Sequence, residues 1–452
     1  MNLALPIHNF FFAILNFKFF MLTHIKNNFI IMMLLPFGMV LFLSAAVIAQ
    51  TPVVEQLTLK QAVTEALEHS KILQASKFEI NASKADETTA RLRPNPTLTA
   101  IGDIGPSNGL GPADKYYGLS LGIPIELGGK RDKRIAFAEA STNLTAEQYD
   151  DVIRQFKLAV QSAYIDFASS GEELIEAREN LALLDSAVIL SRYRVAGKDI
   201  SATELSRTEV ERDKYFLSTA ALDNTFRTAR ITLLNLLGRN GTSLFVEVQP
   251  DTSIFEPLKQ NKIGEIPTVD SLVFIAEIER PDIRALKAAE KADSANLELQ
   301  KAIASIDLNV SLDLTRQTGV TFYGTTVSVP LKFFDRNQGE IEKAEVRVSQ
   351  ARFNTEATLL RLRADITNAR NDVLIKQNAV SILQNNIIQK SSDVRNAVEF
   401  AYRRGGTSLV DYLDAARTYN ELRTLYYDAL ADYAKSLLTL NAIIGKDLLY
   451  EK

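Results

Sequence analysis

Two long stretches without proline constrain this chain more than any other feature of its sequence. They cover residues 125–249 and 331–452, and both are rich in Ala, Leu, Glu, Arg, Lys and Gln. Because proline breaks helix interiors and these residue types favour helices, both stretches are predicted to be helical. Each contains one principal interruption, Val195–Gly197 in the first and Arg403–Gly406 in the second. The sequence therefore predicts two long helical hairpins.

The two hairpins are expected at residues 130–237 and 338–444, with arms of matching length, which indicates an internal duplication. The stretch Gly118–Leu127 recurs as Gly324–Phe333, and the segments around the two interruptions also resemble each other. Apolar and small residues recur in steps of three and four along the first arm, which is typical of a coiled coil. At 1.5 Å per residue the longer arms would reach roughly 95 Å, far beyond a globular helix.

The duplication sets the predicted domain boundaries. Each repeat is expected to contain a helix, a pair of strands and a long helical hairpin. A leader is expected at residues 1–49, the first repeat at 50–240, a linker or equatorial segment at 241–268 and the second repeat at 269–452. The strand pairs are expected at 97–104 with 116–124 and at 306–315 with 321–330.

The N-terminal apolar run indicates export. Residues 29–49 are apolar and end in Val47–Ala49, which is typical of a signal peptide cleaved before residue 50. The alternative is a permanent transmembrane helix, since about 20 apolar residues span a bilayer. Pro36 and Gly38 inside the run favour cleavage. The phenylalanine-rich stretch before it has no role in such a signal, so translation is expected to start at Met21.

The segments between the helices alternate apolar and small polar residues. In the second repeat Val310, Leu312 and Leu314 alternate with polar residues, and in the first Leu119 and Leu121 do the same. This period of two predicts strands with one apolar face. Such strands suit either an outer-membrane barrel or a soluble hairpin facing a protein core, and the alternation alone does not separate them. Four strands cannot close a barrel, so a pore would need several protomers.

Residue usage excludes most catalytic chemistry. The 452-residue chain contains no cysteine and no tryptophan, and His69 is the only histidine after residue 49. Thiolate or imidazole metal centres and Ser-His-Asp triads need residues that are absent from the exported part. The formal net charge of −4 argues against a nucleic-acid partner. We therefore expect no enzymatic activity, no metal site, no cofactor and no nucleic acid.

Taken together, these features resemble the TolC-like outer-membrane factor family, the exit ducts of tripartite efflux pumps and type I secretion systems. The resemblance rests on the duplication, the strand pair in each repeat, Pro124 and Pro330, and the hairpin turns with glycine. Within the family, Arg93–Leu98 and Glu126–Arg131 look like the branch of cobalt-zinc-cadmium efflux outer-membrane subunits.

The resemblance implies a mainly α fold with a transmembrane β part. Three protomers would share a twelve-stranded barrel in the outer membrane of a Gram-negative bacterium, and their helices would form a long periplasmic tunnel. The implied partners are a periplasmic adaptor (membrane fusion protein), an inner-membrane RND-type transporter and outer-membrane lipid. Metal cations or drugs would pass without a covalent step.

A periplasmic coiled-coil adaptor or scaffold without membrane insertion is the competing class. An adaptor normally carries one helical hairpin that splits a small lipoyl-like β-domain. This chain has two predicted hairpins and paired alternating strands, which favours the duct.

Asp411 and Asp414 are the predicted gate. Their i, i+3 spacing places them on one helix face, and the family has an acidic pair in the lumen near the closed entrance. Three copies would form two carboxylate rings that attract cations. The alternative is that both are solvated surface acids.

The residues of the two hairpin turns are the second candidate site. Arg403 and Arg404 are predicted either to latch a closed tip or dock the adaptor, or to be simply solvated. Val195, Gly197, Gly405 and Gly406 are predicted to form the turns that meet the adaptor, since glycine admits turn conformations that other residues resist.

The third candidate site is the junction between barrel and tunnel. Pro124, Pro330, Gly128 and Gly129 are predicted to bend the chain there. The glycine pair with its following basic residues also suggests a phosphate loop, but it lacks the spacing of a Walker sequence and follows a membrane-type strand.

Overall fold

The computed structural model describes residues 53–104, 115–239, 246–260, 264–317 and 319–448. The predicted leader at 1–49 and the predicted start at Met21 lie outside these residues. The chain divides into two compact units. The larger one, Gln56–Gly241 with Val248–Lys452, holds every element discussed below except the first residues of two short strands, β1 and β4.

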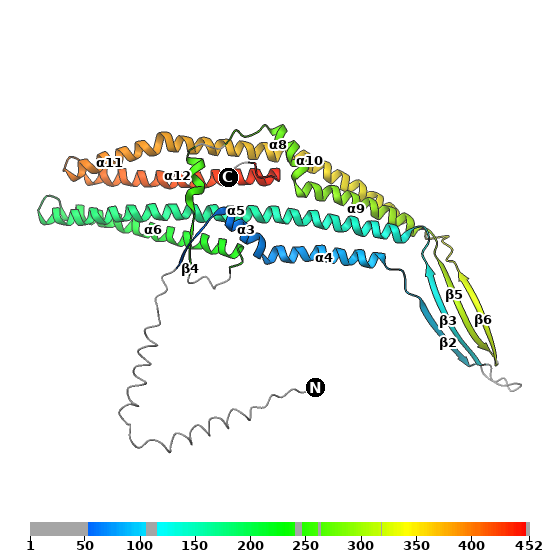
Figure 1. The fold of residues 1–452 in the computed structure, drawn as a ribbon. Helices are drawn as coiled ribbons and strands as arrows, with labels where there is room; N and C mark the ends of the chain where they lie inside the picture. Colours follow the sequence, from blue (N-terminus) through cyan, green and yellow to red (C-terminus); the bar gives the residue numbers. More distant parts are fainter. Residues whose placement is uncertain (1–52, 105–114, 240–245, 261–263, 318, 449–452) are drawn as a thin grey trace, which may run out of the picture. The chain divides into compact units, whose positions relative to one another are not determined.

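The first half consists of a short strand, two helices, two longer strands and two long helices (Figure 1). In chain order they are β1 (Val53–Leu57), α3 (Leu59–His69), α4 (Lys71–Arg91), β2 (Thr97–Ile104), β3 (Lys115–Ile125), α5 (Lys130–Ala196) and α6 (Ala202–Leu236). The connection to the second half consists of β4 (Val246–Pro250), the 3₁₀ turn η2 (Thr252–Phe255) and α7 (Glu256–Lys259).

The second half repeats this order with one difference. Its elements are α8 (Val269–Glu279), α9 (Pro281–Ile303), β5 (Leu308–Gln317), β6 (Val320–Ser328), α10 (Gln338–Ile382), the π-helical segment η3 (Leu383–Ile388), α11 (Gln389–Arg403) and α12 (Leu409–Ile444). The long arm of the first half is a single helix, whereas a π-helical segment interrupts the long arm of the second. The sequence analysis did not predict this segment.

Local hydrogen bonds explain where the returning arms begin. Ser201 caps α6 and Ser408 caps α12, and each exchanges hydrogen bonds with the acid three residues later, Glu204 or Asp411. Such capping boxes satisfy backbone N–H groups that the first helical turn leaves without partners. Both returning arms therefore begin with the same kind of cap.

Helix α5 forms the centre of the helical part. It packs against α4, α6, α9 and α12, so it joins both halves of the duplication. Tyr164 and Phe167 are fully buried in it, as are Tyr433 and Leu437 in α12. The Tyr164 hydroxyl donates a hydrogen bond of 2.7 Å to the carbonyl of Leu57. Within the described ranges, no helix has both the length and the apolar character needed to cross a lipid bilayer.

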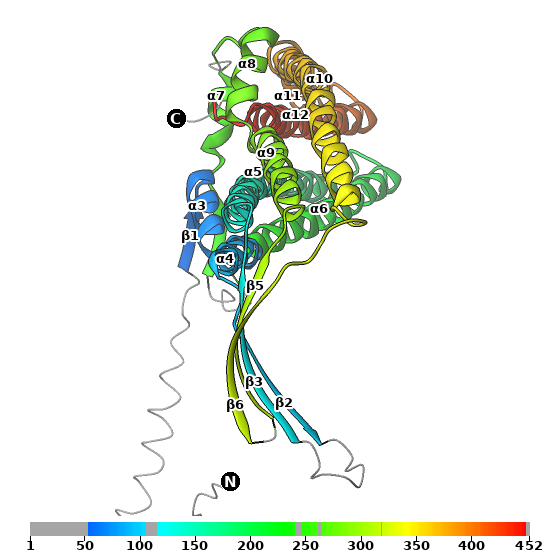
Figure 2. The same cartoon turned by 90° about the vertical axis from the view of Figure 1, so that its right-hand side faces the viewer.

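The four longest strands form one antiparallel sheet in the order β2-β3-β5-β6 (Figure 2). The central pair, β3 with β5, comes from the two different halves. Leu119 lies opposite Leu314 and Leu121 opposite Leu312, so their side chains share a face. Within the part of the chain that the structure describes, each edge strand, β2 or β6, has a neighbour on one side only.

The bounds of three strands differ by one or two residues from those expected. β3 spans 115–125 instead of 116–124, β5 spans 308–317 instead of 306–315, and β6 spans 320–328 instead of 321–330. Pro124 lies inside β3, opposite Asn309, and not at its end. The strand tolerates this proline because β2 begins opposite Gly122, so that among the described residues β3 has only one neighbouring strand at Pro124.

Candidate functional site

The faces of the sheet differ in chemistry. Leu119, Leu121, Leu312 and Leu314 are exposed or half-buried on the face that they share. On the other face, the carboxylate of Asp313 accepts hydrogen bonds from Ser120 at 2.5 Å and from Thr326 at 2.6 Å. A polar network thus links β3, β5 and β6. One face suits lipid and the other suits a polar lumen, and both edges of the sheet are open among the described residues.

The start of α5 forms the junction between helices and sheet. Gly128 and Gly129 adopt left-handed backbone angles, with φ of 70° and 68°. A side chain on Gly128 would place its Cβ 2.1 Å from the Ser305 hydroxyl oxygen, whereas one on Gly129 would meet no atom within 4 Å. The second half also has a left-handed residue at this position, since Asn337, directly before α10, has φ of 61°. Both long helices therefore begin after a left-handed residue.

Ion pairs fix the same junction across the two halves. The buried ammonium of Lys130 lies 2.6 Å from the Asp307 carboxylate, whose other oxygen accepts the backbone N–H of Leu127 at 3.1 Å. Arg134 pairs with Glu126 at 2.6 Å and also donates to carbonyl groups at the end of α4. The sequence predicts the glycines of this junction but not Asp307 and Ser305. These two residues lie far along the chain from residues 127–130, and no local sequence pattern marks them.

The two predicted gate acids lie one turn apart at the start of α12. Asp411 accepts hydrogen bonds from the hydroxyl groups of Ser408 at 2.7 Å and Thr407 at 2.9 Å. These bonds, that from Ser408 first, lower the pKa of Asp411 below its usual value. Asp414 is exposed and pairs with Arg417 at 2.8 Å. Whether the two acids face a lumen stays a prediction.

Arg403 and Arg404 have their partners on their own helix. Arg403 pairs with Glu399 at 2.5 Å, and the Arg404 guanidinium lies 4.1 Å from the ring centre of Phe400. Among the described residues neither forms an ion pair, a hydrogen bond or a ring contact with the first hairpin. A latch formed by these two arginines stays a prediction. A role for Arg403 or Arg404 in adaptor docking stays a prediction.

Arg194 makes the contact between the hairpin tips. Its guanidinium lies 5.3 Å from the ring centre of Tyr402 and also donates to the Tyr402 carbonyl at 3.5 Å. The ring of Tyr402 stacks on Tyr412 at 5.2 Å, and both rings are buried. Sequence reasoning missed this contact, although Arg194 and Tyr402 both lie in the duplicated segments Tyr193–Gly197 and Tyr402–Gly406.

The turn residues behave differently in the two hairpins. Gly405 has φ of 77°, a conformation that glycine adopts without strain. Gly197 has φ of −75°, and Lys198 takes the left-handed conformation with φ of 64°. Gly197 therefore lies in the predicted turn, directly after α5, but the left-handed angle of that turn belongs to Lys198. A contact of these turns with an adaptor stays a prediction. The N–H groups of Lys198 and Asp199 satisfy the last carbonyls of α5, including that of Val195 at 3.0 Å.

A two-faced sheet with open edges, joined to two long helical hairpins, defines a membrane channel of the exit-duct class. The family model described as outer membrane efflux protein matches residues 62–239 and 272–446, more than half of the chain. The chain therefore belongs to the outer membrane efflux protein family. It is an outer-membrane exit channel for efflux, as its sequence predicts.

Relatives and solved structures agree with this assignment. The cobalt-zinc-cadmium resistance protein CzcC of Cupriavidus metallidurans is 26% identical over 396 residues, which cover 86% of this chain and 90% of CzcC. The nickel and cobalt resistance protein CnrC of the same organism is 26% identical over 309 residues, 67% of this chain and 69% of CnrC. The open-state MtrE outer membrane channel of Neisseria gonorrhoeae superimposes with a TM-score of 0.69 at 18% identity, covering 86% and 89% of the two chains.

These comparisons confirm the predicted fold class and family, including the likeness to the metal-resistance branch. The similar proteins are outer-membrane channel or efflux proteins of Gram-negative bacteria and not enzymes. Members of the family form efflux pumps with adaptors and inner-membrane transporters, and TolC-like channels are trimers.

Proposed function

We propose that three copies of this chain form the exit duct of a tripartite pump that exports divalent metal cations from a Gram-negative bacterium. The observation that carries this proposal is the four-stranded sheet with an apolar face, a polar face and two open edges. Three such sheets joined edge to edge would close a barrel and leave no free edge. The helical hairpins would then extend into the periplasm.

The likeness to the cobalt-zinc-cadmium and nickel-cobalt resistance proteins supports metal cations as the cargo. In the proposed trimer, Asp411 and Asp414 of three protomers form two carboxylate rings at the tunnel entrance. The capping hydrogen bonds that lower the pKa of Asp411 keep its ring charged at neutral pH. Charged rings raise the local concentration of cations and disfavour anions.

The hairpin tips are the proposed contact with the rest of the pump. A periplasmic adaptor would meet the turns at Val195–Gly197 and Arg403–Gly406, and an RND-type transporter would deliver the cargo. Within each protomer, the contact of Arg194 with Tyr402 would hold the second hairpin against the first while the entrance is closed. Release of this contact would accompany opening.

Single-channel currents in planar bilayers test the gate. Replacing both acids, Asp411→Asn with Asp414→Asn, is expected to lower the preference for cations and to weaken block by divalent cations several-fold, because two rings of charge are lost. Asp86→Asn, an exposed acid on α4, is the matched control and should behave as wild type. Selectivity and block that match wild type in the double variant would rule out the gate role.

A further inference from the structure

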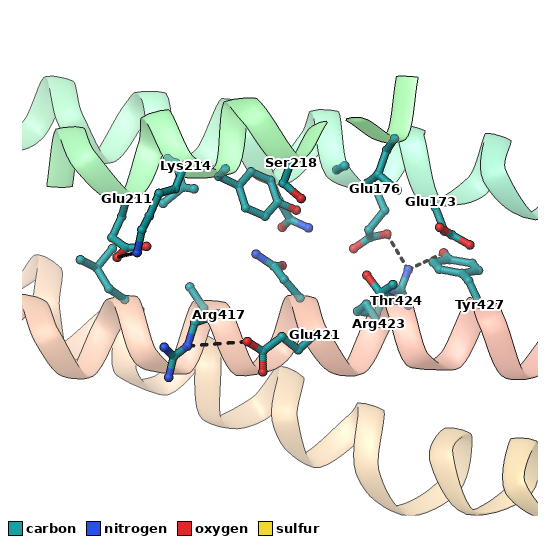
Figure 3. A pocket seen from close by; sticks show the side chains of 18 residues that line it. Glu173, Glu176, Glu211, Lys214, Ser218, Arg417, Glu421, Arg423, Thr424 and Tyr427 are labelled. Atoms are coloured by element: carbon teal, nitrogen blue, oxygen red, sulfur yellow. Dashed lines mark hydrogen bonds and ion pairs between the residues drawn. The ribbon is translucent and has the colours of Figure 1, made fainter. Parts of the chain in front are cut away.

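A pocket opens between the first hairpin and α12 (Figure 3). Its walls come from α5 and α6 on one side and from α12 on the other, and its volume is about 320 Å³. This volume lies within the range of small-molecule sites. The residues that line it include apolar side chains such as Ala177 and Leu222 and the rings of Tyr215 and Tyr427.

Two polar atoms of this pocket are buried without a hydrogen-bond partner. Both belong to α12, and they are Oδ1 of Asn420 and Nε of Arg423. The residue Asn180 on α5, which also lines the pocket, is only 7% exposed, and its amide lies beside the Tyr215 hydroxyl. A buried donor or acceptor without a partner costs on the order of 1–3 kcal/mol, and native proteins contain few of them. Two such atoms and a buried amide lining one pocket indicate that a ligand completes the site.

The charged side chains of the pocket indicate the sign of the charge that the ligand carries. Three lining carboxylates each pair with a lining cation, Glu176 with Arg423 at 2.5 Å, Glu211 with Lys214 at 3.1 Å and Glu421 with Arg417 at 3.8 Å. Glu173 accepts a hydrogen bond from the Ser169 hydroxyl at 3.1 Å and has no cationic partner among the described residues. The charge that the pocket lacks is therefore positive.

We propose that this pocket binds a small arylalkylamine, an aromatic ring that carries an alkylammonium group. Its ammonium group pairs with Glu173, its ring packs between the apolar wall and the tyrosine rings, and its polar edge meets Asn180 and Asn420. Cations are favoured beside aromatic rings as well as beside carboxylates. A bound metal ion fits less well, because the described residues include no cluster of three or more metal-ligating side chains. The bound amine would join α5 and α6 to α12.

The protonation of Glu173 gives the site a pH dependence. Burial and the nearby charge of Asp428 raise the pKa of Glu173 to about 7. Other titratable or charged groups line the pocket on every wall: Glu176 on α5, Glu211, Lys214 and Tyr215 on α6, and Arg417, Glu421, Arg423 and Tyr427 on α12. An ammonium binds the carboxylate form of Glu173, so affinity falls as the pH drops below neutral.

Calorimetric titration of the purified full-length protein in detergent with tryptamine tests the proposal. Tryptamine carries an indole ring and an amine that stays protonated at and below pH 8. At pH 8 we expect saturable binding at one site per chain, weaker by at least about tenfold at pH 5.5. Indole-3-ethanol, which has the same ring without the amine, should bind at least about tenfold more weakly at pH 8.

Glu173→Gln keeps the shape of the side chain and removes its charge, and it is expected to weaken tryptamine binding at least about tenfold. Glu172→Gln makes the same change at the neighbouring position outside the lining and should bind as wild type. Thermal melting of both variants checks that they are folded. The proposal is overturned if tryptamine shows no saturable binding to the wild-type protein, or if the folded Glu173→Gln variant binds it with wild-type affinity.

Discussion

At the scale of single residues, Tyr402 holds the hairpin tips together. Its buried ring lies between the Arg194 guanidinium and the ring of Tyr412, so it contacts α5 and α12 while belonging to α11. A cation–π contact with a partly desolvated ring contributes about 1 kcal/mol. That energy is small enough for an adaptor to displace and large enough to bias a two-state gate.

Arg194→Gln should therefore favour the open tip. A loss of about 1 kcal/mol corresponds to a roughly fivefold increase in the open population, measured as open probability in planar bilayers. Arg192→Gln is the control, because Arg192 pairs with Glu209 inside the first hairpin at 2.9 Å and not across the tips. Equal open probabilities for the Arg194 variant and the control would contradict this role.

The raised pKa of Glu173 predicts that the stability of the protein depends on pH. Its pKa is raised to about 7 in the folded protein, so the unfolded chain loses this proton first and stability falls as the pH rises from about 4.5 to 7. Glu173→Gln should stabilise the protein at pH 8 by about 1 kcal/mol, a figure reduced for the partial exposure of the side chain. At pH 5 the variant and wild type should melt together. A gain of the same size at both pH values would show that the charge is not the cause.

At the scale of elements, the junction between helix and strand depends on two adjacent glycines with different surroundings. Alanine at either position is expected to lower the stability of the protein by about 1 kcal/mol, because an L-residue is strained in the left-handed conformation. At Gly128 the added Cβ also collides with Ser305, which follows α9, whereas at Gly129 it meets open space. Gly128→Ala should thus displace the second half against the first, and Gly129→Ala should not.

The yield of assembled channel in the outer membrane measures this difference. We expect Gly129→Ala to assemble nearly as wild type and to melt slightly earlier, and Gly128→Ala to assemble at a clearly lower yield. Similar yields for the two alanine variants would mean that the contact with Ser305 does not set the junction.

The fold class was predictable because its signals are local. Absence of proline, helix-favouring residues and a period of two act over a few neighbouring residues, and they determine each helix or strand. The strand order β2-β3-β5-β6 was not predictable. β3 and β5 are nearly two hundred residues apart, and no local pattern shows which strands become neighbours in the sheet. The contact of Arg194 with Tyr402 and the ion pair of Lys130 with Asp307 were not predictable either, because both join residues that are far apart in the chain. Gly197 lies in the turn where it was predicted, but which turn residue takes the left-handed angle was not predictable, since it is Lys198.

At the scale of the whole molecule, the edges of the sheet explain why one chain does not suffice. Backbone N–H and C=O groups at the outer edges of β2 and β6 have no strand partner among the residues that the structure describes. In a lipid bilayer each unpaired backbone group costs several kcal/mol, so only a closed barrel is stable there. The edges of one protomer would then be satisfied by those of its neighbours, and folding into the membrane would be coupled to assembly.

The mass of the complex extracted from purified outer membranes in mild detergent tests this coupling most directly. We predict a trimer of about 135 kDa after removal of the leader, found in the outer-membrane fraction and shifted to the monomer mass by heating. A soluble periplasmic monomer or dimer would contradict the shared barrel and would make the two hairpins those of an adaptor or scaffold.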